Sequence, residues 1–127
     1  MPDLDTFYRN YIRCLNHQSW TELGQFVSED VEYNGLRVGL DGYRHMLERD
    51  FQQILDLQFV IRLLVTDSQT IAARLAFDCS PTGVFQGVAV DGRRLHFCEN
   101  VFYEVSSGRI AQVWSVIDKT AVEMQMA

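Results

Sequence analysis

The sequence lacks the features of several protein classes. Its three cysteines are widely spaced and odd in number, which suits neither a metal motif nor a disulfide framework. Lysine and arginine together number 11 against 17 acidic residues, so the net charge is -6. This balance argues against nucleic acid or an anionic membrane surface as the main partner. No apolar run is long enough to cross a bilayer, and the polar first ten residues do not resemble a signal peptide. We therefore expect a soluble, cytoplasmic protein.

Length and organisation indicate one domain. A chain of 127 residues can bury more than half of its unfolded surface without a metal or disulfide to support it. The sequence contains no linker, repeat or low-complexity tract. We predict a single domain over residues 1–127, with no cofactor and no metal ligands.

The first half of the chain has mainly helical periodicity. Apolar residues recur at helical spacing over residues 4–15, after an aspartate cap at position 3 or 5. Ser19 and Glu22 have the spacing of a capping box and predict a short helix through Phe26. Asp41 is predicted to cap a third helix, whose apolar stripe extends to Ile54.

The second half has the period of two that is typical of strands. Residues 57–66 and 70–79 alternate, and a weaker strand is predicted over 84–90. In the alternation of 57–66, Leu63 and Val65 fall on the apolar face. Helices followed by an antiparallel meander indicate an α+β fold. We predict a curved, mostly antiparallel sheet over the three N-terminal helices, which forms a cone with a small-molecule pocket.

The last predicted hairpin carries a carboxylate on an apolar strand face. Odd positions from Leu95 and from Ile110 onward are apolar except for Glu99 and Ser115. A three-residue loop ending in Gly108 would bring both odd faces together and pair Glu99 with Ser115. A carboxylate among apolar neighbours is expected to have a raised pKa, which suits proton transfer near neutral pH. The alternative is a structural carboxylate that points to the pocket mouth or binds an arginine or an amide.

The order of elements resembles the NTF2-like superfamily. The closing strings ENVFY and SGRIAQVWSVID are similar to those of its SnoaL-like branch of polyketide and ester cyclases. The resemblance extends from the first helix to Asp118, and Trp20, residues 31–35, residues 40–43 and the final hairpin carry it. It implies an NTF2-like cone and a cofactor-independent aldol cyclisation of an apolar carbonyl compound.

The resemblance also implies where a catalytic set would lie. The family aspartate corresponds to Ser115 and the family histidine to Val101, whereas the family asparagine corresponds to Asn34. Glu99 is therefore our candidate base, in place of the missing aspartate. Asp118 is a secondary catalytic candidate, although its position after the last strand favours a cap of the C-terminal turn.

Four residues are candidates for substrate binding: Tyr33, Asn34, Tyr103 and Ser115. Asn34 can equally serve turn chemistry with Gly35, and the Tyr103 hydroxyl can find a partner within the fold. The predicted function is proton abstraction in a cyclase or isomerase. The alternative is a non-catalytic module that binds a small molecule or dimerises.

The even face of the final hairpin combines Phe102 and Trp114 with polar residues. This face is too apolar for open water, so it predicts a homodimer through the outer face of the sheet.

Overall fold

The computed structural model describes residues 3–127. The elements in chain order are α1 (Leu4–Asn16), the 3₁₀ helix η1 (Trp20–Gln25), β1 (Val27–Tyr33), β2 (Leu36–Arg37), α2 (Gly39–Gln53), β3 (Val60–Thr66), β4 (Thr70–Cys79), β5 (Thr82–Phe85), β6 (Val88–Asp91), β7 (Leu95–Ser106), β8 (Arg109–Ile117) and α3 (Lys119–Met126). None of the helices over these residues is long and apolar enough to span a membrane.

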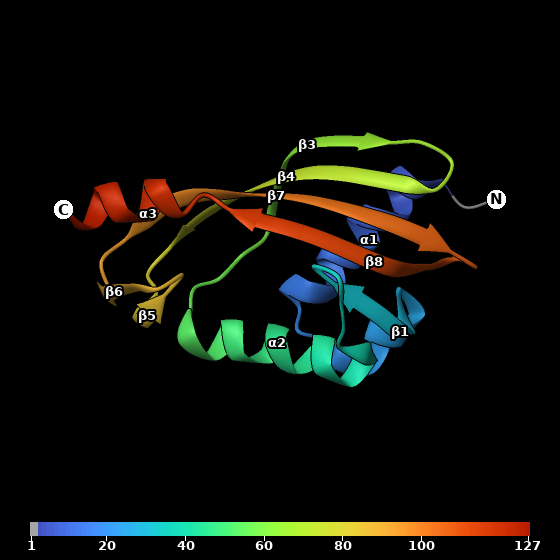
Figure 1. Ribbon diagram of the computed structural model, residues 1–127, viewed down its shortest axis with the longest axis horizontal. Coiled ribbons are helices and arrows are strands. Elements are labelled where there is room, and N and C mark those ends of the chain that lie inside the picture. The colour runs from blue at the N-terminus through green and yellow to red at the C-terminus, as the bar shows by residue number, and fades with distance from the viewer. Residues whose placement is uncertain (1–2) are drawn as a thin grey trace.

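The strands form one curved sheet of six and a separate two-stranded hairpin. The large sheet has the order β2-β1-β8-β7-β4-β3, and only β1 and β8 pair in parallel. Figure 1 shows α2 beneath this sheet and the β5–β6 hairpin with α3 at one end. The predicted α+β class and the mostly antiparallel curved sheet are confirmed.

The helices place their apolar stripes against the inner face of the sheet. Tyr8 and Tyr11 of α1 and Tyr43 of α2 are buried there, together with the inward residues of β4 and β7. Along β4 the inward set begins at Ile71 and ends at Cys79, as its alternation predicts. The core and the hollow of the cone therefore share the same wall.

The β7–β8 hairpin has a different turn from the one predicted. Its loop contains only Ser107 and Gly108, both at positive φ, which is the type I′ geometry. The extra residue that keeps odd positions on one face is a bulge at Ala111 of β8. As a result Glu99 pairs with Ile117, and Ser115 pairs with Val101. The predicted pairing of Glu99 with Ser115 is wrong by two residues, although both side chains share a face.

A second bulge changes which residues of β3 face inward. Ile61 pairs with Leu75, but Leu63 already pairs with Arg74, so the alternation reverses at Arg62. Leu63 and Val65 consequently lie on the outer face, where they are 63% and 68% exposed, and Leu64 takes the inward position beside Ala73.

The segment predicted as one weak strand is also different: it is the β5–β6 hairpin, turned at Gln86 and Gly87. The Gln53 side chain joins this hairpin to α2, because its amide donates to the carbonyls of Thr82 and Val84 at 2.7 and 2.6 Å.

The three helix starts expected from capping residues differ in outcome. Asp3 caps α1 as predicted, accepting from the Asp5 amide. Asp41 lies within the first turn of α2 and is not its cap, because the helix already begins at Gly39. The Ser19 side chain makes no capping hydrogen bond to η1, so the capping box is absent and the segment is a 3₁₀ helix.

Candidate active site

A cavity lies between the inner face of the sheet and helices α1 and α2. Its free volume is about 90 Å³. Glu99, Val101 and Tyr103 of β7 contribute to its wall. The remaining wall residues come from the two helices, β1, β4, β8, the β5–β6 hairpin and the segment before β3: Tyr11, Leu15, Tyr33, Tyr43, Met46, Leu47, Asp50, Ile54, Leu57, Phe59, Leu75, Phe77, Phe85, Gln86, Phe97, Val113 and Ile117.

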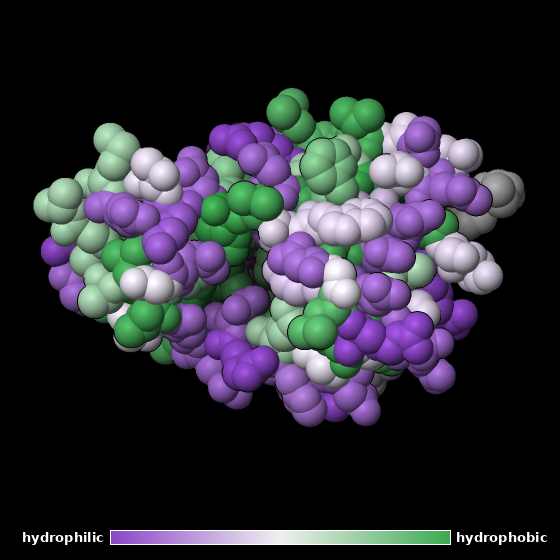
Figure 2. Space-filling view, viewed as in Figure 1, coloured by the Kyte–Doolittle hydropathy of each residue, from purple (hydrophilic) through white to green (hydrophobic). Residues whose placement is uncertain are grey.

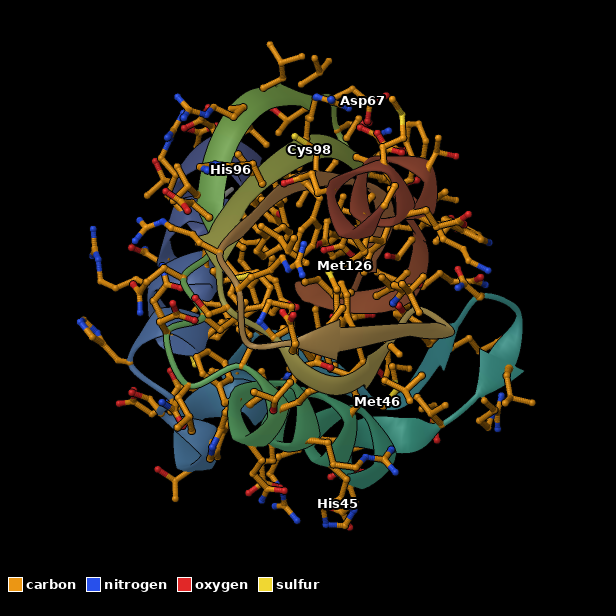
Figure 3. The ribbon with its side chains drawn as sticks, turned by 90° about the vertical axis from the view of Figure 1, so that its left-hand side faces the viewer. His45, Met46, Asp67, His96, Cys98 and Met126 are labelled. Carbon is orange, nitrogen blue, oxygen red and sulfur yellow. The ribbon has the colours of Figure 1, made fainter. Side chains whose placement is uncertain are left out.

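The cavity opens toward the end of the molecule that carries the hairpin. Asp50 and Gln86 are exposed wall residues and mark its mouth. Figure 3 shows Met46, another wall residue, between α2 and the β5–β6 hairpin at this end. The same region appears in Figure 2 as a recess with apolar atoms inside it.

Glu99 is the carboxylate in the middle of the wall. It remains partly accessible because it lines the cavity, and its carboxyl accepts a hydrogen bond from the Ser115 hydroxyl through Oε2. Burial raises the pKa of Glu99, the Ser115 hydrogen bond opposes that rise, and the charge of Asp50 adds to it. No other side chain donates to Glu99 among the hydrogen bonds of residues 3–127. Desolvation is therefore the main influence on the pKa of the Glu99 carboxyl.

Asp50 is a second carboxylate of the cavity that the sequence reasoning missed. It stands on α2, and although the residue is exposed at the mouth, the protein packed around its carboxyl raises the pKa to about 6. A signal for it was present: Asp50 falls on the helical stripe of Tyr43 and Leu47, at spacings of three and four residues. Asp50 interrupts the apolar stripe of a helix, as Glu99 interrupts the apolar face of a strand.

All five tyrosines of the chain gather at one part of the cavity. The hydroxyls of Tyr8 and Tyr103 are 2.9 Å apart, and those of Tyr11 and Tyr43 are 2.6 Å apart. Tyr33 packs on Tyr43, with ring centroids 6.2 Å apart. Burial raises the pKa of each of these tyrosines, so their hydroxyls stay neutral hydrogen-bond donors at physiological pH.

A second cluster of rings lies at the other part of the wall. Phe77 stacks on Phe97 at 5.2 Å, Phe59 meets Phe77 at 5.3 Å, and Phe85 meets Phe97 at 5.1 Å. Inward positions of β7 run in the order Phe97, Glu99, Val101, Tyr103. Six residues of strand span roughly 20 Å, so the phenylalanine and tyrosine clusters lie at opposite ends, with Glu99 between them.

The structure brings together four of the six predicted site residues. Glu99, Tyr33 and Tyr103 line the cavity, and Ser115 adjoins it through its hydrogen bond to Glu99. Tyr11 and Tyr43 also contribute polar groups to the same site.

The other two predicted residues lie outside the cavity wall. Asn34 is exposed, and its side chain holds the backbone of β8: it accepts from the Ser115 amide at 2.8 Å and donates to the Ser115 carbonyl at 3.3 Å. Asp118 is exposed and caps α3, accepting from the Ala121 amide at 3.1 Å. Neither side chain is placed to contact a ligand in the cavity.

A family model for SnoaL-like polyketide cyclases matches residues 5–126 of this cone and its cavity. The chain belongs to the SnoaL-like polyketide cyclase family. The comparison with curated proteins found no match.

Solved structures of this fold match this chain over 96% or more of its length. A SnoaL-like polyketide cyclase from Agrobacterium tumefaciens is 49% identical, with all of both chains covered and a TM-score of 0.98. TsrD from Streptomyces laurentii is 20% identical over 100% of this chain and 98% of its own, with a TM-score of 0.85. IdmH from Streptomyces antibioticus is 16% identical over 96% of each chain, with a TM-score of 0.82. The latter two likenesses show the fold alone.

Proposed function

We propose that this SnoaL-like protein removes a proton next to a carbonyl group of a small apolar compound, with Glu99 as the base. Glu99 takes the proton, the carbon–hydrogen bond breaks, and its electron pair moves to the carbonyl oxygen as an enolate. In a cyclisation the enolate carbon then attacks a second carbonyl of the same molecule, and the new alkoxide takes up a proton. In an isomerisation, the proton returns to another carbon. No external oxidant or reductant is required.

The observation that supports this proposal is the position of Glu99. The cavity presents one carboxylate in the middle of its wall, held by a single hydroxyl donor and raised in pKa by desolvation. Such a group is a stronger base once ionised than a solvated carboxylate. Ser115 and Val101, which are cross-strand partners, carry no acid or base of their own.

The alternative is a cone that binds a ligand without catalysis. The small free volume and the neutral residues at 101 and 115 favour this alternative. One experiment separates the two functions.

The experiment measures hydrogen–deuterium exchange at the α-carbons of cyclohexanone and 1-indanone in D₂O by proton NMR. Wild-type protein is expected to accelerate exchange, and Glu99→Gln is expected to lose the acceleration by about 100-fold or more. Glu104→Gln is the matched control, because Glu104 is an exposed glutamate on the same strand. Exchange that rises with pH through the titration of Glu99 would identify the ionised carboxylate as the active form.

Two results would contradict catalysis by Glu99. Equal exchange rates for wild type and Glu99→Gln would exclude Glu99 as the base. Ketones that bind in the cavity, as seen by chemical-shift changes, yet exchange at the buffer rate would leave ligand binding as the function.

We further propose that two copies of the chain associate through the outer face of the sheet. The cross-strand register places Val65, Ala72, Phe102 and Trp114 in one row over four strands. Phe102 is 54% and Trp114 is 40% exposed in the single chain. A self-complementary patch of this kind suits a two-fold dimer, which is the commonest oligomer of soluble proteins.

Sedimentation velocity tests the dimer. Wild type is expected to sediment as a dimer and Phe102→Glu as a monomer, because the charge would be buried without a partner. Val84→Glu is the control, since Val84 is also an exposed apolar residue but lies on the β5–β6 hairpin. A monomeric wild type, or a Phe102→Glu variant that remains dimeric, would contradict the proposed interface.

A further inference from the structure

The two tyrosine pairs of the cavity have more hydrogens than they use. A phenol hydroxyl has one hydrogen to donate, so a pair of hydroxyls contains two hydrogens. The bond between Tyr11 and Tyr43 uses one of these hydrogens, and the bond between Tyr8 and Tyr103 does the same. Each pair therefore keeps one unused O–H group.

These unused groups have no protein acceptor among the hydrogen bonds of residues 3–127. The four tyrosines are at most 4% exposed, so bulk water does not solvate them. A buried donor without an acceptor costs roughly 1–3 kcal/mol, so the arrangement calls for an acceptor from a ligand or a trapped water. Tyr11, Tyr43 and Tyr103 line the cavity, whereas Tyr8 lies behind Tyr103.

The position of these donors matches a charged oxygen better than a neutral one. In each pair one hydroxyl donates to the other, and this polarises the second hydroxyl and strengthens its own donation. Donors held by packing before a charge develops are the arrangement that stabilises an oxyanion. The phenylalanine cluster at the opposite end supplies an aromatic, apolar surface for the rest of the ligand.

We propose that the Tyr11–Tyr43 and Tyr8–Tyr103 pairs form an oxyanion-binding site, which holds the enolate oxygen of a planar carbonyl compound whose apolar part lies against the phenylalanine cluster. The inference rests on the proposed function in taking that oxygen to be an enolate. A free volume of about 90 Å³ is smaller than a cavity that holds benzene, which is about 150 Å³. The enclosed part of the substrate is therefore no larger than one ring, and the rest of the substrate extends through the mouth beside Asp50.

The test uses 4-nitrophenol, a planar compound whose oxyanion is conjugated with an apolar ring. Its phenolate absorbs visible light and the phenol does not, so absorbance gives the fraction ionised when bound. Measurements are made in Glu99→Gln protein, because this removes charge repulsion from Glu99 and separates the result from the base proposal. The measured quantity is the ratio of phenolate affinity to phenol affinity.

The Tyr8–Tyr103 pair offers a matched set of variants. Tyr103→Phe removes the hydroxyl at the cavity, and the ratio is expected to fall by at least about tenfold. Tyr8→Phe removes the same group from the same hydrogen bond but leaves the Tyr103 hydroxyl in place, so a clearly smaller fall is expected. The double variant Tyr11→Phe and Tyr43→Phe removes the other pair while keeping volume, and a fall of the same order as for Tyr103→Phe is expected.

Three outcomes would overturn the oxyanion site. In the first, Tyr103→Phe lowers the affinity ratio no more than Tyr8→Phe does. In the second, the ratio is unchanged in the double variant. In the third, 4-nitrophenol does not bind in the cavity. Near-ultraviolet circular dichroism of each variant shows that its core is intact. If Glu99→Gln keeps ketone exchange while the phenolate ratio behaves as expected, only the base proposal fails.

Discussion

The replacement Glu99→Gln should change how the stability of the protein depends on pH. Burial raises the pKa of Glu99 in the folded chain above its ordinary value of 4.5, whereas the unfolded chain keeps the ordinary value. A raised carboxyl pKa means that the folded state holds its proton more tightly. This contribution to stability is complete below pH 4.5 and is lost as the pH rises through the folded-state pKa.

The size of the effect follows from proton linkage. Between the unfolded and folded pKa values, one proton is bound in the folded state and not in the unfolded state. The free energy of unfolding then falls by about 1.4 kcal/mol per pH unit. The glutamine side chain does not titrate and is close in shape to the neutral acid. Wild type and Glu99→Gln are thus expected to have similar stability at low pH and to diverge by this slope as pH rises.

Urea unfolding, followed by the fluorescence of Trp20 and Trp114, measures the divergence at pH values from about 4.5 to about 8. Asp50, whose pKa is also raised, is present in both proteins, so its contribution largely cancels in the difference. Glu104→Gln controls for the loss of one negative charge from a chain of net charge -6. Protein concentration is held constant in case of association.

Ser115→Ala should strengthen the pH dependence that Glu99→Gln removes. The Ser115 hydroxyl lowers the pKa of Glu99, so its removal raises that pKa further and extends the sloping region to higher pH. Parallel stability curves for wild type and Glu99→Gln over the whole range would show that Glu99 titrates as a solvated carboxyl. Glu99 would then not be a desolvated base.

Three further changes test the roles of other residues. Asn34→Ala should lower the free energy of unfolding by about 2 kcal/mol in urea unfolding, because it removes two hydrogen bonds to β8 at a position of positive φ. Ser107→Ala, at the equivalent position of the β7–β8 turn, should lower it by less. Asp118→Ala should lower the free energy of unfolding by about 1 kcal/mol and leave ketone exchange unchanged, because the residue caps α3. A large loss of ketone exchange would instead assign Asp118 a role in catalysis. Gln53→Ala should speed amide hydrogen exchange in β5 and β6 with little change elsewhere, and unchanged exchange there would show that Gln53 does not hold the hairpin.

Local pattern predicted the inward faces well where strands are regular. The alternation over β4 and β7 placed Ile71, Glu99 and Tyr103 on the face that lines the core and cavity. It failed along β3, where the bulge at Arg62 reverses the alternation. The bulge at Ala111 keeps the odd positions of β8 on the inner face, but it shifts their pairing with β7. Neither residue type signals a bulge by itself.

The candidate site was predicted only in part for a related reason. A lone acid on an apolar strand is visible as a break in a period of two, and Glu99 was found in this way. Asp50 breaks a helical stripe near its end, where an exposed acid is ordinary, so the break was overlooked. The sequence could not show that the Asn34 side chain bonds the β8 backbone, because this contact joins residues 81 positions apart in the chain.

The sequence alone was sufficient for the α+β class, the apolar inner face, the acidic surface balance and the presence of one carboxylate among apolar residues. These properties depend on composition and on the order of neighbouring side chains. Only the tertiary structure decided that Glu99 meets Ser115 diagonally, that tyrosines from α1, α2 and β7 pair their hydroxyls beside it, and that Asp50 joins the same cavity. These meetings depend on bulges, turn lengths and the packing of helices on the sheet, which bring together residues that are distant in the chain.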